Sequence, residues 1–195
     1  MSQARTLTLA DVAAPRGNAL MQVTLIVLAS LVTALAAQAE IRLPWTPIPI
    51  TGQTFAVLLT GIVLGAQRAF LAQMLYLLEG CAGLPVFSGG ASGFLHLVGP
   101  SGGYLIAFPF AAFATGILAE RAWDRRPFTM FLAMLAGGTV IFAMGLAQLS
   151  RFVPAGQVLQ TGLLPFIPGD LIKSAIAAGV FPLLWRAVRR FEERE

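Results

Sequence analysis

The feature that most constrains this chain is a series of long apolar windows that contain no charged residue. The first window, residues 17–39, lies between Arg16 and Glu40. It exceeds the roughly 20 residues that a helix needs to cross a bilayer. Only 11% of the residues are charged and 57% are hydrophobic, whereas a soluble domain carries about 25% charged residues. We therefore expect an integral membrane protein.

The apolar windows predict helices, because backbone polar groups inside a bilayer must be satisfied within the protein. We expect an all-α integral membrane protein with six transmembrane helices. They cover residues 17–39, 54–67, 68–81, 103–120, 127–150 and 169–190. Residues 19–190 would form one transmembrane substrate-binding domain, flanked by cytoplasmic segments at residues 1–18 and 191–195. The prolines within residues 44–49 end the first helix, because proline cannot continue it.

Charge distribution predicts the orientation in the membrane. Six spans place both termini on one side, together with Arg5, Arg16, Arg68, Arg121, Arg125, Arg126, Arg186, Arg189, Arg190 and Arg194. Only Arg42 and Arg151 fall on the other side. Cytoplasmic loops carry an excess of basic residues, so we expect a multi-pass protein of the bacterial cytoplasmic (inner) membrane with both termini cytoplasmic. Three long connections then lie outside and cap an outward-facing cavity.

Residues 1–39 also resemble a secretory signal, with a basic start, an apolar run and a final "AQA". The run is long for a signal peptide, and its removal would spoil the even number of spans. We therefore expect the first helix to remain in the protein. The basic residues lie in short clusters between apolar runs, so the net charge of +4 indicates membrane topology and not a nucleic-acid partner.

Several chemistries find no support in the sequence. The single cysteine, Cys81, excludes an internal disulfide and a cysteine-based zinc cluster. His96 is the only histidine, and with few carboxylates it lacks the partners of a metal site. Lys173 precedes a serine, but Ile172 stands where a P-loop needs glycine. We expect no cofactor, no metal and no hydrolysis of ATP by the chain itself.

A charged doublet interrupts the last apolar window. Asp170 and Lys173 lie three residues apart, which places them on one face of a helix. They fall in the outer part of the membrane, where unpaired charges are costly. One interpretation is an internal ion pair at a helix end. The other is a ligand site for a small, uncharged polar group that has both hydrogen-bond donors and an acceptor.

The segment at residues 83–104 is too rich in glycine and proline for a helix and too apolar for a water-exposed loop. Irregular backbone at membrane depth must be buried or line a cavity. Ser88, Ser92, Ser101 and Tyr104 offer hydrogen bonds there. The alternatives are a re-entrant plug without a ligand, or an intramembrane Ser/His hydrolase centred on His96, for which one histidine is a weak signal.

Two further helices carry candidates with open alternatives. Glu79 is either a buried partner of Arg42 or Arg151 or a site residue, and Tyr76 lies on nearly the same helix face. Ala29, Thr33 and Ala37 form a stripe of small residues along the first helix. Such stripes let helices approach closely in membranes, so the stripe is either internal packing or a docking face for a partner subunit.

Four segments in order, "LPWTPIPITGQTFAVLLTGIVLG", "YLLEGCAGLPVFSGG", "GPSGGYLIAFP" and "IPGDLIK", resemble the BioY family, the biotin-specific S components of energy-coupling factor (ECF) transporters. The resemblance covers about residues 20–190. It implies the six-helix ECF S-component fold with biotin bound in an outward-facing cavity. It also implies a partner module of one transmembrane T subunit and two ATPase subunits, and an S component that topples in the membrane to carry biotin inward.

The resemblance assigns ligand binding to Asp170 and Lys173, and it assigns the coupling face to Ala29 and Thr33, although Thr33 replaces the usual alanine. Asp170 would accept from the two ureido N–H groups of biotin, and Lys173 would donate to the ureido carbonyl. Further candidates are Gln53, Thr51, Tyr76, Glu79, Ser92 and Tyr104 around the cavity, with Trp45, Phe87 and Phe94 as apolar walls. We expect a transport subunit and not an enzyme. The alternative is a solitary facilitator of biotin or another small solute that works without ATPases, as a homodimer.

Overall fold

The computed structural model describes residues 6–13 and 18–192, and these are mostly helical, as predicted. Six long helices correspond to the six predicted windows, with ends that differ by a few residues. They are α2 (Ala19–Gln38), α3 (Gln53–Leu64), α4 (Ala66–Cys81), α6 (Gly102–Ala119), α7 (Pro127–Leu149) and α9 (Ile167–Glu192). Arg5, Arg16 and Arg194 lie outside the described residues. So do residues 1–5, 14–17 and 193–195 of the two predicted terminal segments.

Shorter elements connect the long helices. They are α1 (Leu9–Ala13), β1 (Glu40–Ile41), β2 (Ile50–Thr51), η1 (Ser88–Gly90), α5 (Leu95–Val98), η2 (Trp123–Arg125), η3 (Ala155–Gln157) and α8 (Val158–Gly162). The two short strands pair antiparallel, with Glu40 opposite Thr51, so the connection between α2 and α3 is a hairpin around the proline cluster and not pure coil. The sequence did not predict this pairing.

Four stretches are long and apolar enough to cross a membrane: α2, α6, α7 and Ala155–Val188, which contains most of α9. Helix α3 is apolar but has only 12 residues, and at 1.5 Å per residue it is about 18 Å long. Helix α4 has 16 residues and carries Arg68 and Glu79. The composition of the long helices makes this a membrane protein, and the count of six spans stays a prediction.

Local sequence explains where the helices begin and end. Asn18 caps α2, accepting from the Met21 N–H at 3.2 Å, which satisfies a free donor of the first turn. Pro127 opens α7, where its missing N–H costs nothing. Gly65 alone joins α3 to α4 with a φ of 80°, a conformation that favours glycine. The two helices therefore meet in a tight reversal.

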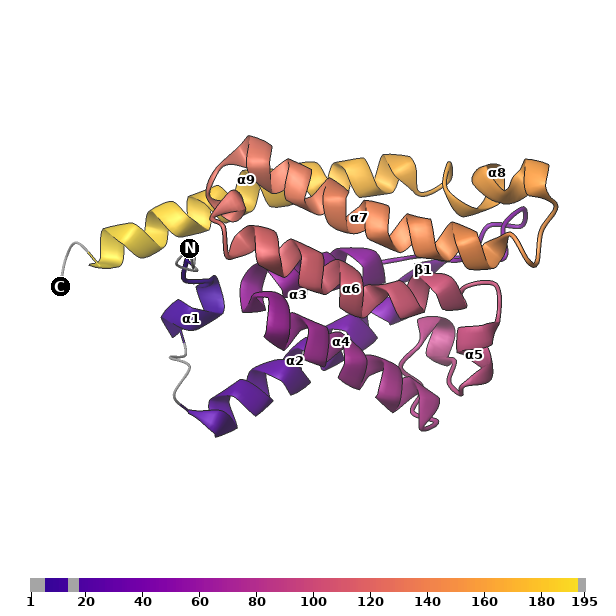
Figure 1. Ribbon diagram of the computed structural model, residues 1–195, viewed down its shortest axis with the longest axis horizontal. Helices are drawn as coiled ribbons and strands as arrows, with labels where there is room; N and C mark the ends of the chain where they lie inside the picture. The colour runs from indigo at the N-terminus through magenta and orange to yellow at the C-terminus, as the bar shows by residue number, and fades with distance from the viewer. Residues whose placement is uncertain (1–5, 14–17, 193–195) are drawn as a thin grey trace, which may run out of the picture.

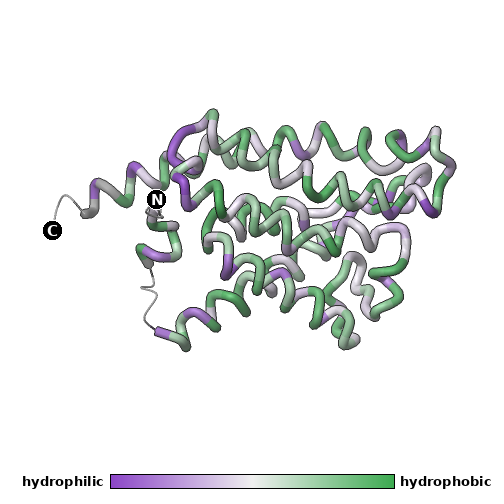
Figure 2. Tube along the Cα trace, viewed as in Figure 1, coloured by the Kyte–Doolittle hydropathy of each residue, from purple (hydrophilic) through white to green (hydrophobic). Residues whose placement is uncertain are grey.

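Helix α6 is the centre of the bundle. It packs against α3, α4 and α7, while α9 lies along α7 and α2 crosses α4 (Figure 1). Close approach depends on glycine: a Cβ at Gly116 would lie 2.4 Å from the Ala66 backbone N, and one at Gly61 would lie 2.0 Å from the Thr115 hydroxyl oxygen. Figure 2 shows apolar residues along every long helix, with polar ones gathered at the connection between α6 and α7.

The two ends of the bundle differ in chemistry. The basic end comprises α1, η2, the Gly65 turn and the C-terminal part of α9, and the loop end comprises the β1–β2 hairpin, η1, α5, η3 and α8 (Figure 1). At the basic end Arg68 forms a buried ion pair with Asp11 at 2.8 Å and donates to the Thr8 hydroxyl at 3.0 Å. Glu120 accepts from the Ala66 N–H at 3.1 Å. These contacts attach α1 and α6 to the α3–α4 turn.

Candidate functional site

The Asp170–Lys173 pair lies in the first turns of α9, facing the start of α3. The Lys173 Nζ lies 3.3 Å from Asp170 Oδ1. The same ammonium donates to the Thr51 carbonyl at 3.1 Å and to the Thr54 hydroxyl at 3.4 Å, and that hydroxyl lies 3.5 Å from Asp170 Oδ1. Both charged side chains are 25% exposed. The predicted ion pair is present, and it joins α9 to the β2–α3 junction.

The pair lines a small cavity at the loop end, here called the inner cavity, of about 50 Å³. Its apolar walls come from Ile48, Ile50, Leu105, Phe108, Phe142 and Phe166, and its polar groups from Thr51, Gln53, Thr54, Ser88, Ser101 and Tyr104. Carboxylate and ammonium therefore stand at the edge of a mainly apolar space. The sequence predicted none of these apolar walls. Aromatic residues inside apolar helices give no signal of which way they face.

A larger space adjoins the inner cavity. This vestibule has a volume of about 350 Å³ and shares Pro49, Ser88 and Ser101 with the inner cavity. Arg42 and His96 also line it, and the His96 ring stacks on Phe87 with centroids 5.6 Å apart. The two spaces together offer a polar pair at one end and a cation at the other.

Arg42 lines the vestibule but was not among the ligand residues predicted from the sequence. Its Nε lies 2.8 Å from Glu40 Oε1, and its side chain is 73% exposed. Glu40 is therefore its carboxylate partner among the described residues, and Glu79, considered as a partner from the sequence, is not. Arg42 is one of only two arginines on the predicted outer side, and that scarcity was the signal available.

Gln53 and Tyr104 both line the inner cavity, but their polar groups already have partners. The Gln53 amide nitrogen donates to the Tyr76 hydroxyl at 2.5 Å, and its oxygen accepts from Thr51 at 3.1 Å. The Tyr104 hydroxyl donates to the Gly162 carbonyl at 2.8 Å. These side chains shape the cavity and hold the loops around it.

The remaining predicted ligand residues lie outside the linings of both spaces. Tyr76 is fully buried and donates to the Val86 carbonyl at 3.0 Å. Glu79 accepts from the Ser30 hydroxyl at 3.2 Å, and its other oxygen is buried without a partner among the described residues. Ser92 is exposed on the loop. A role for these three in ligand binding stays a prediction.

The three predicted apolar wall residues differ in burial, and none of them lines either space. Phe87 is fully buried and packs edge-on against Tyr76, with centroids 5.6 Å apart. Trp45 and Phe94 are more than half exposed and line neither space. Their role as walls of the ligand site stays a prediction.

The small-residue stripe of α2 is largely covered by the chain itself. Thr33 and Ala37 are fully buried. The Thr33 hydroxyl donates to the Ala29 carbonyl at 3.1 Å and accepts from the Gln73 amide at 3.0 Å. This favours the packing interpretation for Thr33, whose side chain cannot touch a partner in this conformation. Ala29 is half-buried, and its place on a docking face stays a prediction.

Comparison with known proteins places this arrangement in a family. The family model described as "BioY family" matches residues 5–190. The "Biotin transporter BioY" of Rhizobium etli is 38% identical over 168 residues, covering 82% of this chain and 88% of the relative. That of Thermotoga maritima is 41% identical over 142 residues, covering 72% of this chain and 82% of the relative.

A solved structure has the same fold. The S component for biotin from an ECF-type ABC transporter superposes with a TM-score of 0.76 at 26% identity, covering 86% of this chain and 92% of the other. The relatives are transporters and not enzymes, which agrees with the transport interpretation and removes the hydrolase alternative. The chain belongs to the BioY family.

Proposed function

We propose that the chain is the biotin-binding S component of an ECF transporter. It binds biotin from outside the cytoplasmic membrane and delivers it inward with a T subunit and two ATPase subunits. The observation that carries the proposal is the Asp170–Lys173 pair at the edge of the inner cavity. The names of the relatives and the likeness to a biotin S component support it.

The doublet matches the chemistry of a ureido ring, which has two N–H donors and one carbonyl acceptor. Asp170 accepts from the N–H groups and Lys173 donates to the carbonyl. Hydrogen bonds to ionised groups are roughly twice as strong as neutral ones. In the structure Asp170 and Lys173 bind each other, and Lys173 also donates to Thr51 and Thr54. Binding therefore exchanges these partners for the ligand, and no charge is left unpaired.

The vestibule suits the other end of the molecule. The thiophane ring lies against the apolar walls of the inner cavity, and the valeryl chain passes Ser88 and Ser101, which line both spaces. The carboxylate then meets the exposed guanidinium of Arg42, a planar group that binds carboxylates in a bidentate manner. Arg42 thus adds a carboxylate-binding residue that the sequence did not predict. In this proposal the loop end of the bundle faces outward.

The chain has no ATP-hydrolysing motif of its own, so the energy for transport has to come from other subunits. The only lysine lies in a helix without the glycines of a P-loop, so hydrolysis belongs to partner subunits. The six helices each cross the membrane, the two termini lie in the cytoplasm, and the half-buried Ala29 of α2 is part of the surface that contacts the T subunit. The alternative, a facilitator that works alone as a homodimer, differs in one measurable respect: it would let biotin enter cells that lack T and ATPase subunits.

The first experiment is calorimetry with purified protein, titrated with biotin and with an analogue lacking the ureido carbonyl. We expect Asp170→Asn to bind biotin about tenfold to a hundredfold more weakly, because one hydrogen bond to a charged group is worth roughly 1.5–3 kcal/mol. The analogue should bind weakly to the unmodified protein. The control is Arg151→Gln, which removes an exposed charge outside both spaces. Undiminished affinity in Asp170→Asn would return the doublet to a purely structural role.

A further inference from the structure

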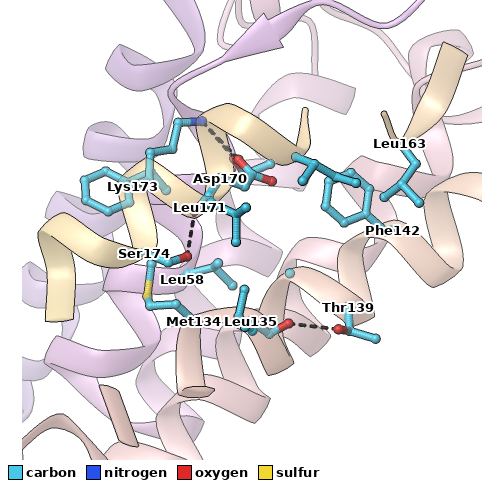
Figure 3. Close-up of a pocket in the computed structure, with 14 residues that line it drawn as sticks. Leu58, Met134, Leu135, Thr139, Phe142, Leu163, Asp170, Leu171, Lys173 and Ser174 are labelled. Atoms are coloured by element: carbon cyan, nitrogen blue, oxygen red, sulfur yellow. Dashed lines mark hydrogen bonds and ion pairs between the residues drawn. The ribbon is translucent and has the colours of Figure 1, made fainter. Parts of the chain in front are cut away.

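A second space lies on the other side of the Asp170–Lys173 pair, between α3, α7 and α9 (Figure 3). This lateral groove has a volume of about 230 Å³. It shares only Thr54, Phe142, Asp170 and Lys173 with the inner cavity. Those four side chains border both spaces. The proposed function places the ureido ring in the inner cavity, and the present inference rests on that assignment.

The groove opens sideways. Its floor contains Leu58 and Met134, both buried, while Leu171 and Thr139 at its rim are exposed. Helix α7 and the stretch that contains α9 are apolar enough to span a membrane. Residues exposed between two such helices face hydrocarbon, because lipid is the solvent of a membrane protein at that depth.

The polar groups of the groove are already satisfied by the chain. The Ser174 hydroxyl donates to the Asp170 carbonyl at 2.7 Å, and the Thr139 hydroxyl donates to the Leu135 carbonyl at 2.9 Å. Apart from the Asp170–Lys173 pair, whose charges bind each other, the groove therefore offers methyl, methylene and aromatic surface to an occupant. That chemistry fits an aliphatic chain and does not fit a polar solute.

We propose that the lateral groove holds one acyl chain of a phospholipid from the leaflet at the loop end. The groove extends along α9 from Ile167 to Ser174, about 10 Å at 1.5 Å per residue, which is the direction in which a lipid tail runs. Its volume lies below the roughly 300–1,000 Å³ of pockets for drug-sized molecules, so it accommodates part of one chain. Protein interiors tolerate few empty voids, and the surrounding tails are the available filling.

The Asp170–Lys173 pair borders hydrocarbon at low cost because its two charges are matched. Both side chains are 25% exposed, and the Lys173 Nζ lies 3.3 Å from Asp170 Oδ1. An unpaired charge at that depth would be costly. The groove therefore presents no unpaired charge to an acyl chain.

Gly138 allows a direct test, because it lines the groove and a Cβ built there meets no atom within 4 Å. Gly138→Leu places a side chain in the groove without a backbone clash. We expect native mass spectrometry of protein purified in mild detergent to find one retained phospholipid per chain in the unmodified protein and none in Gly138→Leu. The matched control is Gly179→Leu on α9, where a Cβ is equally free and the groove is not touched.

Photolabelling locates the chain. Protein in phosphatidylcholine vesicles is labelled with phosphatidylcholine that carries a diazirine on its acyl chain, and adducts are mapped by mass spectrometry. We expect adducts at Leu135 and Leu171 that fall to background in Gly138→Leu and persist in Gly179→Leu. Equal lipid retention and equal labelling in all three proteins would overturn the proposal, and so would the absence of retained lipid together with uniform labelling of every exposed helix face.

Discussion

Lys173 has three hydrogen-bond partners in the structure, and each comes from a different element. Asp170 lies one turn earlier on α9, Thr54 opens α3, and Thr51 ends β2. The sequence predicted the pair with Asp170, because spacing along a helix is readable from the chain alone. The bonds to Thr51 and Thr54 were not predictable, since they join residues more than a hundred positions apart.

Asp124 is one of the buried carboxylates at the basic end. Asp124 in η2 is 1% exposed, accepts from the Trp185 Nε1–H, and leaves Oδ1 without a partner among the described residues. Burial raises the pKa of the Asp124 carboxyl above its ordinary value, although the Trp185 hydrogen bond and Arg125 oppose the shift. The Arg125 guanidinium also lies 4.3 Å above the Trp185 ring.

The raised pKa of Asp124 predicts a pH dependence of stability. The folded protein holds the proton more tightly than the unfolded chain does, so stability is greatest below the unfolded pKa and falls as pH rises through the folded pKa. Asp124→Asn removes this ionisation and keeps an acceptor for Trp185. We expect thermal unfolding in detergent, measured between about pH 4 and 7, to show a smaller fall in Tm with pH in Asp124→Asn. Parallel curves for the two proteins would contradict this.

At the scale of elements, glycine decides how closely the central helices approach. The sequence predicted where α3, α4 and α6 lie, because charged or glycine residues bound each apolar window. It did not identify Gly61 and Gly116 as contact points, because a glycine inside an apolar helix gives no sign of its neighbour. The short elements α5 and α8 were also missed, since their loops lack helical periodicity.

Gly116 offers a test of that close approach. A Cβ there would lie 2.4 Å from the Ala66 N and 2.5 Å from its Cα, and these backbone atoms cannot move aside. We expect Gly116→Ala to lower the free energy of unfolding by about 1–3 kcal/mol, the usual cost of overpacking. Gly179→Ala, in open space on α9, should be neutral or slightly stabilising. Equal midpoints in denaturant for both variants would show that the α4–α6 contact is looser than described.

For the whole molecule, we expect the proposed coupling face of α2 to separate binding from transport. Ala29 is half-buried on α2, away from the inner cavity. We expect Ala29→Leu to bind biotin with unchanged affinity by calorimetry and to lose biotin uptake in cells that contain the T and ATPase subunits. Ala175→Leu, an equal enlargement at an exposed position of α9, should retain uptake. Loss of binding in Ala29→Leu would mean that this position is internal packing, as Thr33 is.

The bundle as a whole was largely readable from the sequence, because its solvent dictates long apolar helices and its basic residues gather at one end. The interior of the site was not, since Phe108, Phe142 and Phe166 line one cavity only when α6, α7 and the turn before α9 assemble. Arg42 shows the same limit: its charge was visible, but its place in the vestibule depends on the β1–β2 hairpin.

The neutral sum of Asp170 and Lys173 bears on how the protein responds to voltage. Moving one elementary charge across a membrane potential of 100 mV is worth about 2.3 kcal/mol. The pair has no net charge, and the ureido ring that it is proposed to bind has none. A reorientation that carries this pair through the bilayer therefore performs no net electrical work at the ring site, whether the protein travels loaded or returns empty.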